Sequence, residues 1–113
     1  MIKRVKGRPR KKKIIHSRPS IDCFGPKGPI GTIEEIPVSV EEYEAIRLHD
    51  LLGKPQKQAA MSMGISQQSF SQMVRRARRK VADAIVNAKA IRIEGGDFIN
   101  KRTMDVAKKL HRK

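Results

Sequence analysis

The sequence contains very few cysteine and aromatic residues. Cys23 is the only cysteine among 113 residues, so an intramolecular disulfide is excluded, which fits a reducing compartment. The aromatic residues are three Phe and one Tyr, and there is no Trp. Sequence-specific RNA recognition usually stacks bases on exposed aromatic rings. The composition therefore disfavours an RNA-binding protein.

Long apolar runs are also missing. No stretch approaches the roughly 18 to 20 apolar residues that a bilayer-spanning helix needs. The basic N-terminus leads into IIHSRPS, which is unlike the apolar centre of a signal peptide. We therefore expect a cytoplasmic protein with no membrane partner.

The residue sets of common enzyme and metal sites are absent from the sequence. The three histidines are scattered without metal-ligand spacing, and Cys23 is best explained as a small residue packed near Phe24. The close carboxylates in SVEEYE and IEEI are explained by helix capping and solvation. No nucleophile with an orienting base and no phosphate-binding loop is found. We predict no catalytic activity, no metal and no cofactor.

Acidic residues are scarce relative to basic ones. The chain has 26 Lys and Arg against 11 Asp and Glu, a formal net charge of +15 and a pI near 10.7. Such a balance is typical of proteins that bind a polyanion. Nine of the basic residues and no acid lie within residues 1–20, and a second concentration begins at residue 67. The charge therefore predicts two contact regions on either side of a nearly neutral scaffold.

The composition divides the chain into four parts. Residues 1–20 are predicted to be a flexible basic arm, because like charges with Gly7, Pro9 and Pro19 disfavour a folded element. Residues 21–38 are a Gly/Pro-rich connector with a short strand, residues 39–96 the folded domain, and residues 97–113 a basic tail. Within the arm, GRPRKKK resembles the minor-groove motif of AT-hook peptides, and a phosphate-binding tail is the alternative. Either way, we expect DNA contacts from Arg8, Arg10, Lys11 and Lys12.

The folded domain is predicted to be mainly α-helical. Ser39 and Glu42 fit a capping box that begins a first helix, which ends at Gly53. Pro55 suits the first turn of a short second helix, which runs to Gly64. AIRIEGG and TIEEI alternate in the way strands do, and we expect them to pair as a short two-stranded ribbon.

Gly64 is predicted to join two helices rather than interrupt one. Ser66 is a suitable N-cap for a third helix over 67–87, and the turn before it favours a glycine with positive φ. Two helices joined by such a turn form a helix-turn-helix unit, whose second helix enters the major groove. The fold class expected is therefore a three-helix, helix-turn-helix domain.

The third helix has one apolar and one polar face. At about 100° per residue, the apolar face contains Phe70, Val74, Ala77, Val81, Ala84, Ile85 and Ala88. Gln can pair with adenine edges, and Arg with guanine edges or phosphates. The predicted DNA contacts of this helix are Ser66, Gln67, Gln68, Ser71, Gln72, Arg75, Arg76 and Arg79.

Several stretches within residues 8–96 resemble a known family. EAIRLHDLLG, QAAMSMGIS, RARRKVADAIVNAKAIRIEGG and FGPKG are similar to small, largely uncharacterised prokaryotic proteins of the UPF0251 type. That family is predicted to bind DNA through a helix-turn-helix similar to region 4 of sigma factors. The resemblance implies a regulatory DNA-binding role. Departures from the pattern, which imply a different target site, are found at Lys57, Gln58, Gln67 and Ser69.

The leading hypothesis is sequence-specific binding of double-stranded DNA by a transcriptional regulator. The alternatives are an RNA-binding or ribosome-associated basic protein, and a sigma-like module that docks on the transcription machinery. A homodimer is expected because helix-turn-helix proteins commonly read two half-sites, with Val86 as a candidate contact.

Overall fold

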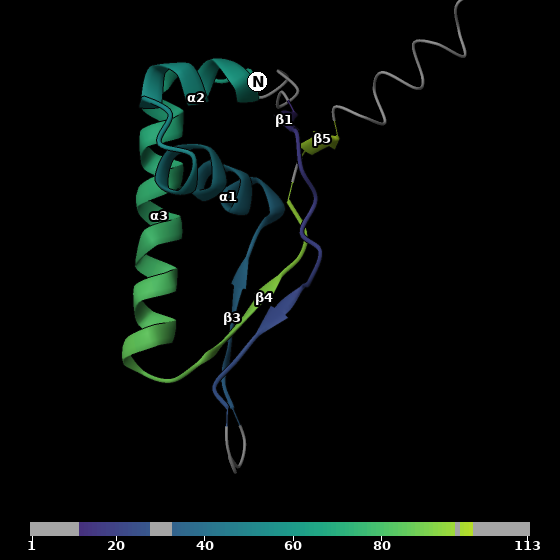
Figure 1. The fold of residues 1–113 in the computed structure, drawn as a ribbon, viewed down its shortest axis with the longest axis vertical. Helices are drawn as coiled ribbons and strands as arrows, with labels where there is room; N and C mark the ends of the chain where they lie inside the picture. The colour runs from purple at the N-terminus through teal and green to yellow at the C-terminus, as the bar shows by residue number, and fades with distance from the viewer. Residues whose placement is uncertain (1–11, 28–32, 97, 101–113) are drawn as a thin grey trace, which may run out of the picture.

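The long helix α3 (Gln67–Val86) organises the fold. The computed structural model describes residues 12–27, 33–96 and 98–100, and within them it contains three α-helices and a three-stranded sheet. Helices α1 (Val40–Ala45) and α2 (Gln56–Met63) pack against one half of α3, and the sheet faces its other half (Figure 1). Among the described helices, none is long and apolar enough to cross a membrane.

The first helix begins as predicted but changes its winding. Ser39 Oγ accepts a hydrogen bond from the Glu42 amide at 3.1 Å, and Glu42 Oε1 accepts one from the Ser39 amide at 3.0 Å. These two bonds confirm the capping box. After Ala45 the chain continues as a π-helix, η2 (Ile46–Leu51), where a plain α-helix was expected. Helix α1 is therefore short and is fixed firmly at its N-terminus.

Gly64 is the left-handed residue that ends α2. Its φ of 69° is a conformation that favours glycine, as the sequence predicted. A Cβ atom at Gly64 would lie 3.5 Å from Ile14 Cδ1, which is an ordinary contact, so the backbone conformation, not lack of space, requires glycine. Ser66 Oγ then accepts a hydrogen bond from the Ser69 amide at 3.0 Å and caps α3. The N-cap prediction is confirmed.

The helical core is centred on α3. Phe70, Val74 and Ala77 are buried, as predicted. Phe70 and Val74 belong to a cluster that also contains residues of α1, η2 and α2. The prediction for Ile85 was wrong, since its side chain is 75% exposed. Ile85 lies at the margin of the apolar face, one residue before the C-terminal end of α3. Figure 1 shows that α1 and α2 do not cover this end of the helix. Ala88 is exposed too and has a positive φ of 54° just after the helix.

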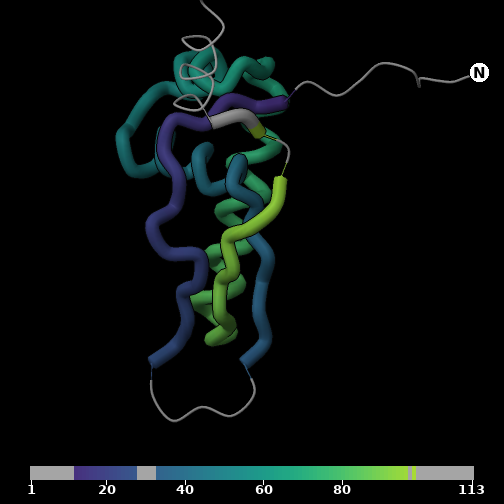
Figure 2. The backbone as a smooth tube through the Cα atoms, turned by 90° about the vertical axis from the view of Figure 1, so that its right-hand side faces the viewer, coloured from purple at the N-terminus to yellow at the C-terminus, as the bar shows by residue number. Residues whose placement is uncertain are grey.

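Strand β4 (Ala90–Ile93) is the centre of the three-stranded sheet. It pairs with β3 (Glu35–Val38), as the predicted ribbon required, and the two strands run in parallel. It also pairs antiparallel with β2 (Cys23–Phe24), which comes from the segment predicted as a connector. Figure 2 shows β4 between the two neighbouring strands. The ribbon is thus one strand larger than the sequence indicated, because β2 is too short to show alternation.

The end of the predicted flexible arm differs from expectation. Lys13–Ile15 form strand β1, which pairs in parallel with β5 (Phe98–Asn100). Ile15 is fully buried in a second cluster with Val38, Val40 and Ile93. The segment was predicted to be flexible because of its high charge, although it contains two consecutive isoleucines. Burial of one of them, Ile15, holds the strand against the domain.

Candidate nucleic-acid interface

The outward side of α3 carries four polar residues that we call the reading face. Its members are exposed and lie within one stripe of the helix, opposite Phe70: Gln68, Gln72, Arg75 and Arg79. Among the described residues, none provides these four side chains with a hydrogen bond or an ion pair. Arg79 exerts only a longer-range attraction, which contributes to lowering the pKa of Asp83. The reading face therefore offers unpaired donors and acceptors to an external ligand.

The other predicted contacts on α3 differ in how available they are. Gln67 is exposed, whereas Ser71 is half-buried. Ser66 is exposed, but its hydroxyl is occupied with Ser69, from which it accepts one bond and to which it donates another. Arg76 is exposed and yet is held by an acid of α1. The structure therefore brings the predicted residues onto one helix but divides them into free and occupied groups.

Three basic residues flank the reading face and are paired with acids; we call them the paired cations. Arg76 Nε lies 3.1 Å from Glu42 Oε2, and Lys80 Nζ lies 2.8 Å from Glu42 Oε1. On the opposite flank, Arg78 donates to both carboxylate oxygens of Asp50, at 2.6 and 3.2 Å. The run RRARRK therefore contributes Arg75 and Arg79 as free cations and the other three as bound ones.

The pairing keeps both acids ionised. Burial acts to raise the pKa of Glu42, but hydrogen bonds from Lys80, the Ser39 amide and Arg76 outweigh it, and the net pKa is lowered. The Arg78 hydrogen bonds likewise lower the pKa of Asp50. The contacts are charge-assisted hydrogen bonds, which are shorter and stronger than neutral ones.

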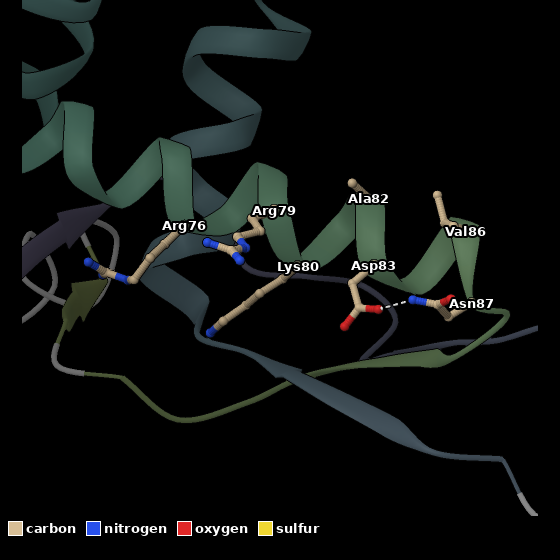
Figure 3. A pocket seen from close by; sticks show the side chains of 7 residues that line it. All are labelled: Arg76, Arg79, Lys80, Ala82, Asp83, Val86 and Asn87. Atoms are coloured by element: carbon tan, nitrogen blue, oxygen red, sulfur yellow. Dashed lines mark hydrogen bonds between the residues drawn. The ribbon is translucent and has the colours of Figure 1, made fainter.

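A groove runs along the C-terminal half of α3. Figure 3 shows Ala82 and Val86 pointing to one side of the helix, while Arg76 and Lys80 point to the other. Asp83 Oδ1 accepts a hydrogen bond from Asn87 Nδ2 at 2.6 Å (Figure 3). No Lys or Arg occurs between residues 81 and 88. The helix thus changes along its length from basic to nearly neutral and apolar.

Two lysines at the start of α2 were not among the predicted site residues. Lys57 is exposed, Lys54 is half-buried, and neither forms an ion pair with another described residue. Pro55 occupies the N-cap of α2 without a side-chain hydrogen bond to the first amides, and such a helix end attracts anions. The signal in the sequence is KPQK directly before a helix.

The predicted arm contacts fall at the edge of the described chain. Arg8, Arg10 and Lys11 lie outside the described residues, and Lys12 is exposed. Lys12 directly precedes β1, which packs against α2 and places Ile14 beside Gly64. His16 Nε2 also donates to the carbonyl oxygen of Ser62 in α2 at 2.9 Å. Lys12 is therefore anchored close to the turn between α2 and α3.

Sequence comparisons identify the family. The profile described as "Protein of unknown function DUF134" matches residues 1–101. The chain belongs to this family. A UPF0251 protein of Dehalococcoides mccartyi is 50% identical over 92 residues, which cover 80% of this chain and 79% of the relative. One from Methanosarcina acetivorans is 39% identical over 106 residues, covering 93% and 95%. The resemblance inferred from the motifs is confirmed, and no solved structure matches the chain.

Proposed function

We propose that this protein is a sequence-specific DNA-binding regulator that places α3 in the major groove. The observation that carries this proposal is the reading face, an exposed stripe of two Gln and two Arg without hydrogen bonds or ion pairs to other described residues. A side chain that is already desolvated or paired must give up that interaction to bind DNA, whereas these four need not. Gln68 and Gln72 can read adenine edges, and Arg75 guanine edges or phosphates.

The arrangement of α2, Gly64 and α3 supports this proposal. The short turn at Gly64, the N-cap of α3 and the close packing of α2 on α3 are features of a helix-turn-helix. The major groove is about 12 Å wide and accepts one α-helix. In this geometry the first helix of the pair crosses the DNA backbone, so that Lys57 and Lys54 supply phosphate contacts. We propose that the unit is similar to region 4 of sigma factors.

The aromatic residues favour duplex DNA over single-stranded RNA. Phe70, which lies on α3, is fully buried and cannot stack on a base. Phe24 is 52% exposed but belongs to β2, in the sheet and not on α3. Base stacking would therefore have to occur away from the unpaired cations of α3. Docking on the transcription machinery and a cytoplasmic location remain predictions.

The proposal is tested by binding of labelled duplexes at increasing salt, measured by fluorescence anisotropy. If about six phosphates are contacted, the slope of log affinity against log salt should be about −5. Unlabelled duplex DNA should compete better than RNA of the same length and sequence. A slope near zero, or RNA as the stronger competitor, would refute the proposal.

A homodimer is the expected binding form. Ile85 and Val86 are 75% and 78% exposed at the C-terminal end of α3, within its neutral segment, where two strongly basic copies would repel each other least. Two-fold pairing would present two copies of α3 to half-sites about one helical turn apart. Sedimentation of the protein on a duplex should therefore show two copies per site, and one copy per site would rule out the dimer.

A further inference from the structure

Glu42 is a buried carboxylate at which two elements meet. Its residue is only 2% exposed. Oε2 accepts from Arg76 Nε at 3.1 Å, and Oε1 accepts from Lys80 Nζ at 2.8 Å and from the Ser39 amide at 3.0 Å. Glu42 therefore caps α1 and holds α3 with the same side chain.

The positions of Arg76 and Lys80 on α3 allow Glu42 to fix the orientation of that helix. Arg76 and Lys80 are four residues apart, so they lie one turn apart on the same flank of the helix, between its buried face and the reading face. Because both residues bind Glu42 from successive turns of α3, the two contacts oppose rotation of the helix about its axis and also sliding along it. Glu42 is itself fixed, because the capping box anchors it to the start of α1. The direction of Gln72 and Arg75 thus depends on a carboxylate that neither residue contacts.

The pairing also lowers the charge that α3 can offer to DNA. Arg76 has a side chain 58% exposed, and Lys80 one of 32%, so both would be near a bound backbone if released. Cations that neutralise phosphates strengthen binding to every sequence alike. Specificity is the ratio of specific to non-specific affinity, and surplus phosphate contacts do not improve it.

We propose that Glu42 is the positioning residue of the reading face, and that it withholds Arg76 and Lys80 from DNA phosphates. This inference rests on the proposed DNA binding. Glu42 contacts no DNA itself. It sets the rotation of α3 and restricts the phosphate contacts of that helix to unpaired cations such as Arg79.

The first test compares two arginines of α3 that differ in having a partner. Arg79→Gln should make the salt slope of duplex binding shallower by about one unit, the effect of one lost phosphate contact. Arg76→Gln should leave the slope at the value of the parent protein. If both variants are shallower by about one unit, Arg76 contacts DNA and the inference about Glu42 is wrong, while the proposed function stands. If Arg79→Gln leaves the slope unchanged, both the phosphate role of α3 and the inference fail.

The second test releases the cations directly. Glu42→Gln preserves the shape of the side chain but removes its charge, so the salt slope should become steeper by about one to two units. Discrimination between the selected duplex and a random one should fall by about tenfold, as expected when one base contact is misplaced. Glu35→Gln is the matched control, because Glu35 is an exposed acid that pairs with Arg92 in the sheet. A Glu42→Gln protein that keeps the slope and discrimination of the parent would overturn the inference. If that variant unfolds, the comparison of Arg76 with Arg79 still decides it.

Discussion

The two sets of basic residues on α3 have the same chemistry and different partners. Arg75 and Arg79 of the reading face have no ion pair with a described residue, whereas Arg76, Arg78 and Lys80 are held by acids 28 to 38 positions away in the sequence. The acids belong to α1 and η2, so the division appears only once these elements pack on α3. A run of charge in a sequence therefore overstates the charge that is available to a ligand.

The largest expected effect is on stability, when the buried side chain that packs α3, the helix carrying both sets, into the core is removed. Phe70→Ala should lower the free energy of unfolding by about 3 to 5 kcal/mol, because it leaves a cavity under α3. Urea denaturation measures this change. Gln72→Ala, two residues away on the reading face, should change it by less than about 0.5 kcal/mol. Equal effects of the two substitutions would show that the assignment of faces is wrong.

The next prediction compares the contribution of strand β1 with that of the residues before it. A chain that begins at Lys12 should keep the stability of the parent and bind all duplexes more weakly, since it loses six basic residues and no described contact. A chain that begins at Ser17 also loses buried Ile15, and its free energy of unfolding should fall by about 2 to 5 kcal/mol, as for a buried Ile truncation. Thermal or urea unfolding of the two chains gives the comparison. If the longer chain is as destabilised as the shorter one, residues before Lys12 belong to the core.

Substitutions in the reading face should affect binding rather than stability. Gln68→Ala or Gln72→Ala should cost about 1 to 3 kcal/mol of binding free energy on a preferred duplex, if each side chain contacts a base edge. Arg78→Gln is the control, because Arg78 is already paired with Asp50, and affinity for that duplex should hardly change. Titration calorimetry gives both values. A larger loss for Arg78→Gln than for either Gln would reverse the distinction between the two sets.

Local signals made much of this structure predictable. The capping box at Ser39, the positive φ of Gly64 and the apolar face around Phe70 depend on residues within a turn or two of one another, and each was confirmed. The pairing of β3 with β4 was also anticipated, because both strands alternate, but its parallel direction was not predicted. These features depend on spacing, which a sequence displays directly.

The remaining features depend on distant partners. Strand β1 was missed because nine basic residues surround its two isoleucines, and the burial of Ile15 becomes apparent only with β3, α1 and β4 in place. The π-helix η2 has no signature in IRLHDL that we could identify. The occupation of Arg76 by Glu42 spans 34 positions, and helical periodicity alone places Arg76 near the polar face.

The smallest effect concerns acid pH. The pKa of Glu42 and that of Asp50 are lowered in the folded protein, so the stability they contribute is present above their unfolded pKa values, about 4.3 and 3.9. That stability is lost as the pH falls through the lower, folded values. The free energy of unfolding should therefore decrease on acidification below about pH 4.5, and less steeply in Glu42→Gln. Urea denaturation between pH 6 and pH 3 measures this decrease. If the free energy of unfolding falls equally in the parent and in Glu42→Gln, the stabilising role of the Glu42 carboxylate is contradicted.

Selection of bound sequences from a random duplex pool, carried out in parallel with the parent protein and with Gln72→Ala, tests the reading face most directly. The parent should enrich one short sequence, and the variant should enrich the same sequence with one position relaxed. Both proteins should remain folded, as judged by circular dichroism. No enriched sequence with the parent, or the same sequence with unchanged discrimination in the variant, would contradict the claim that this side of α3 reads DNA.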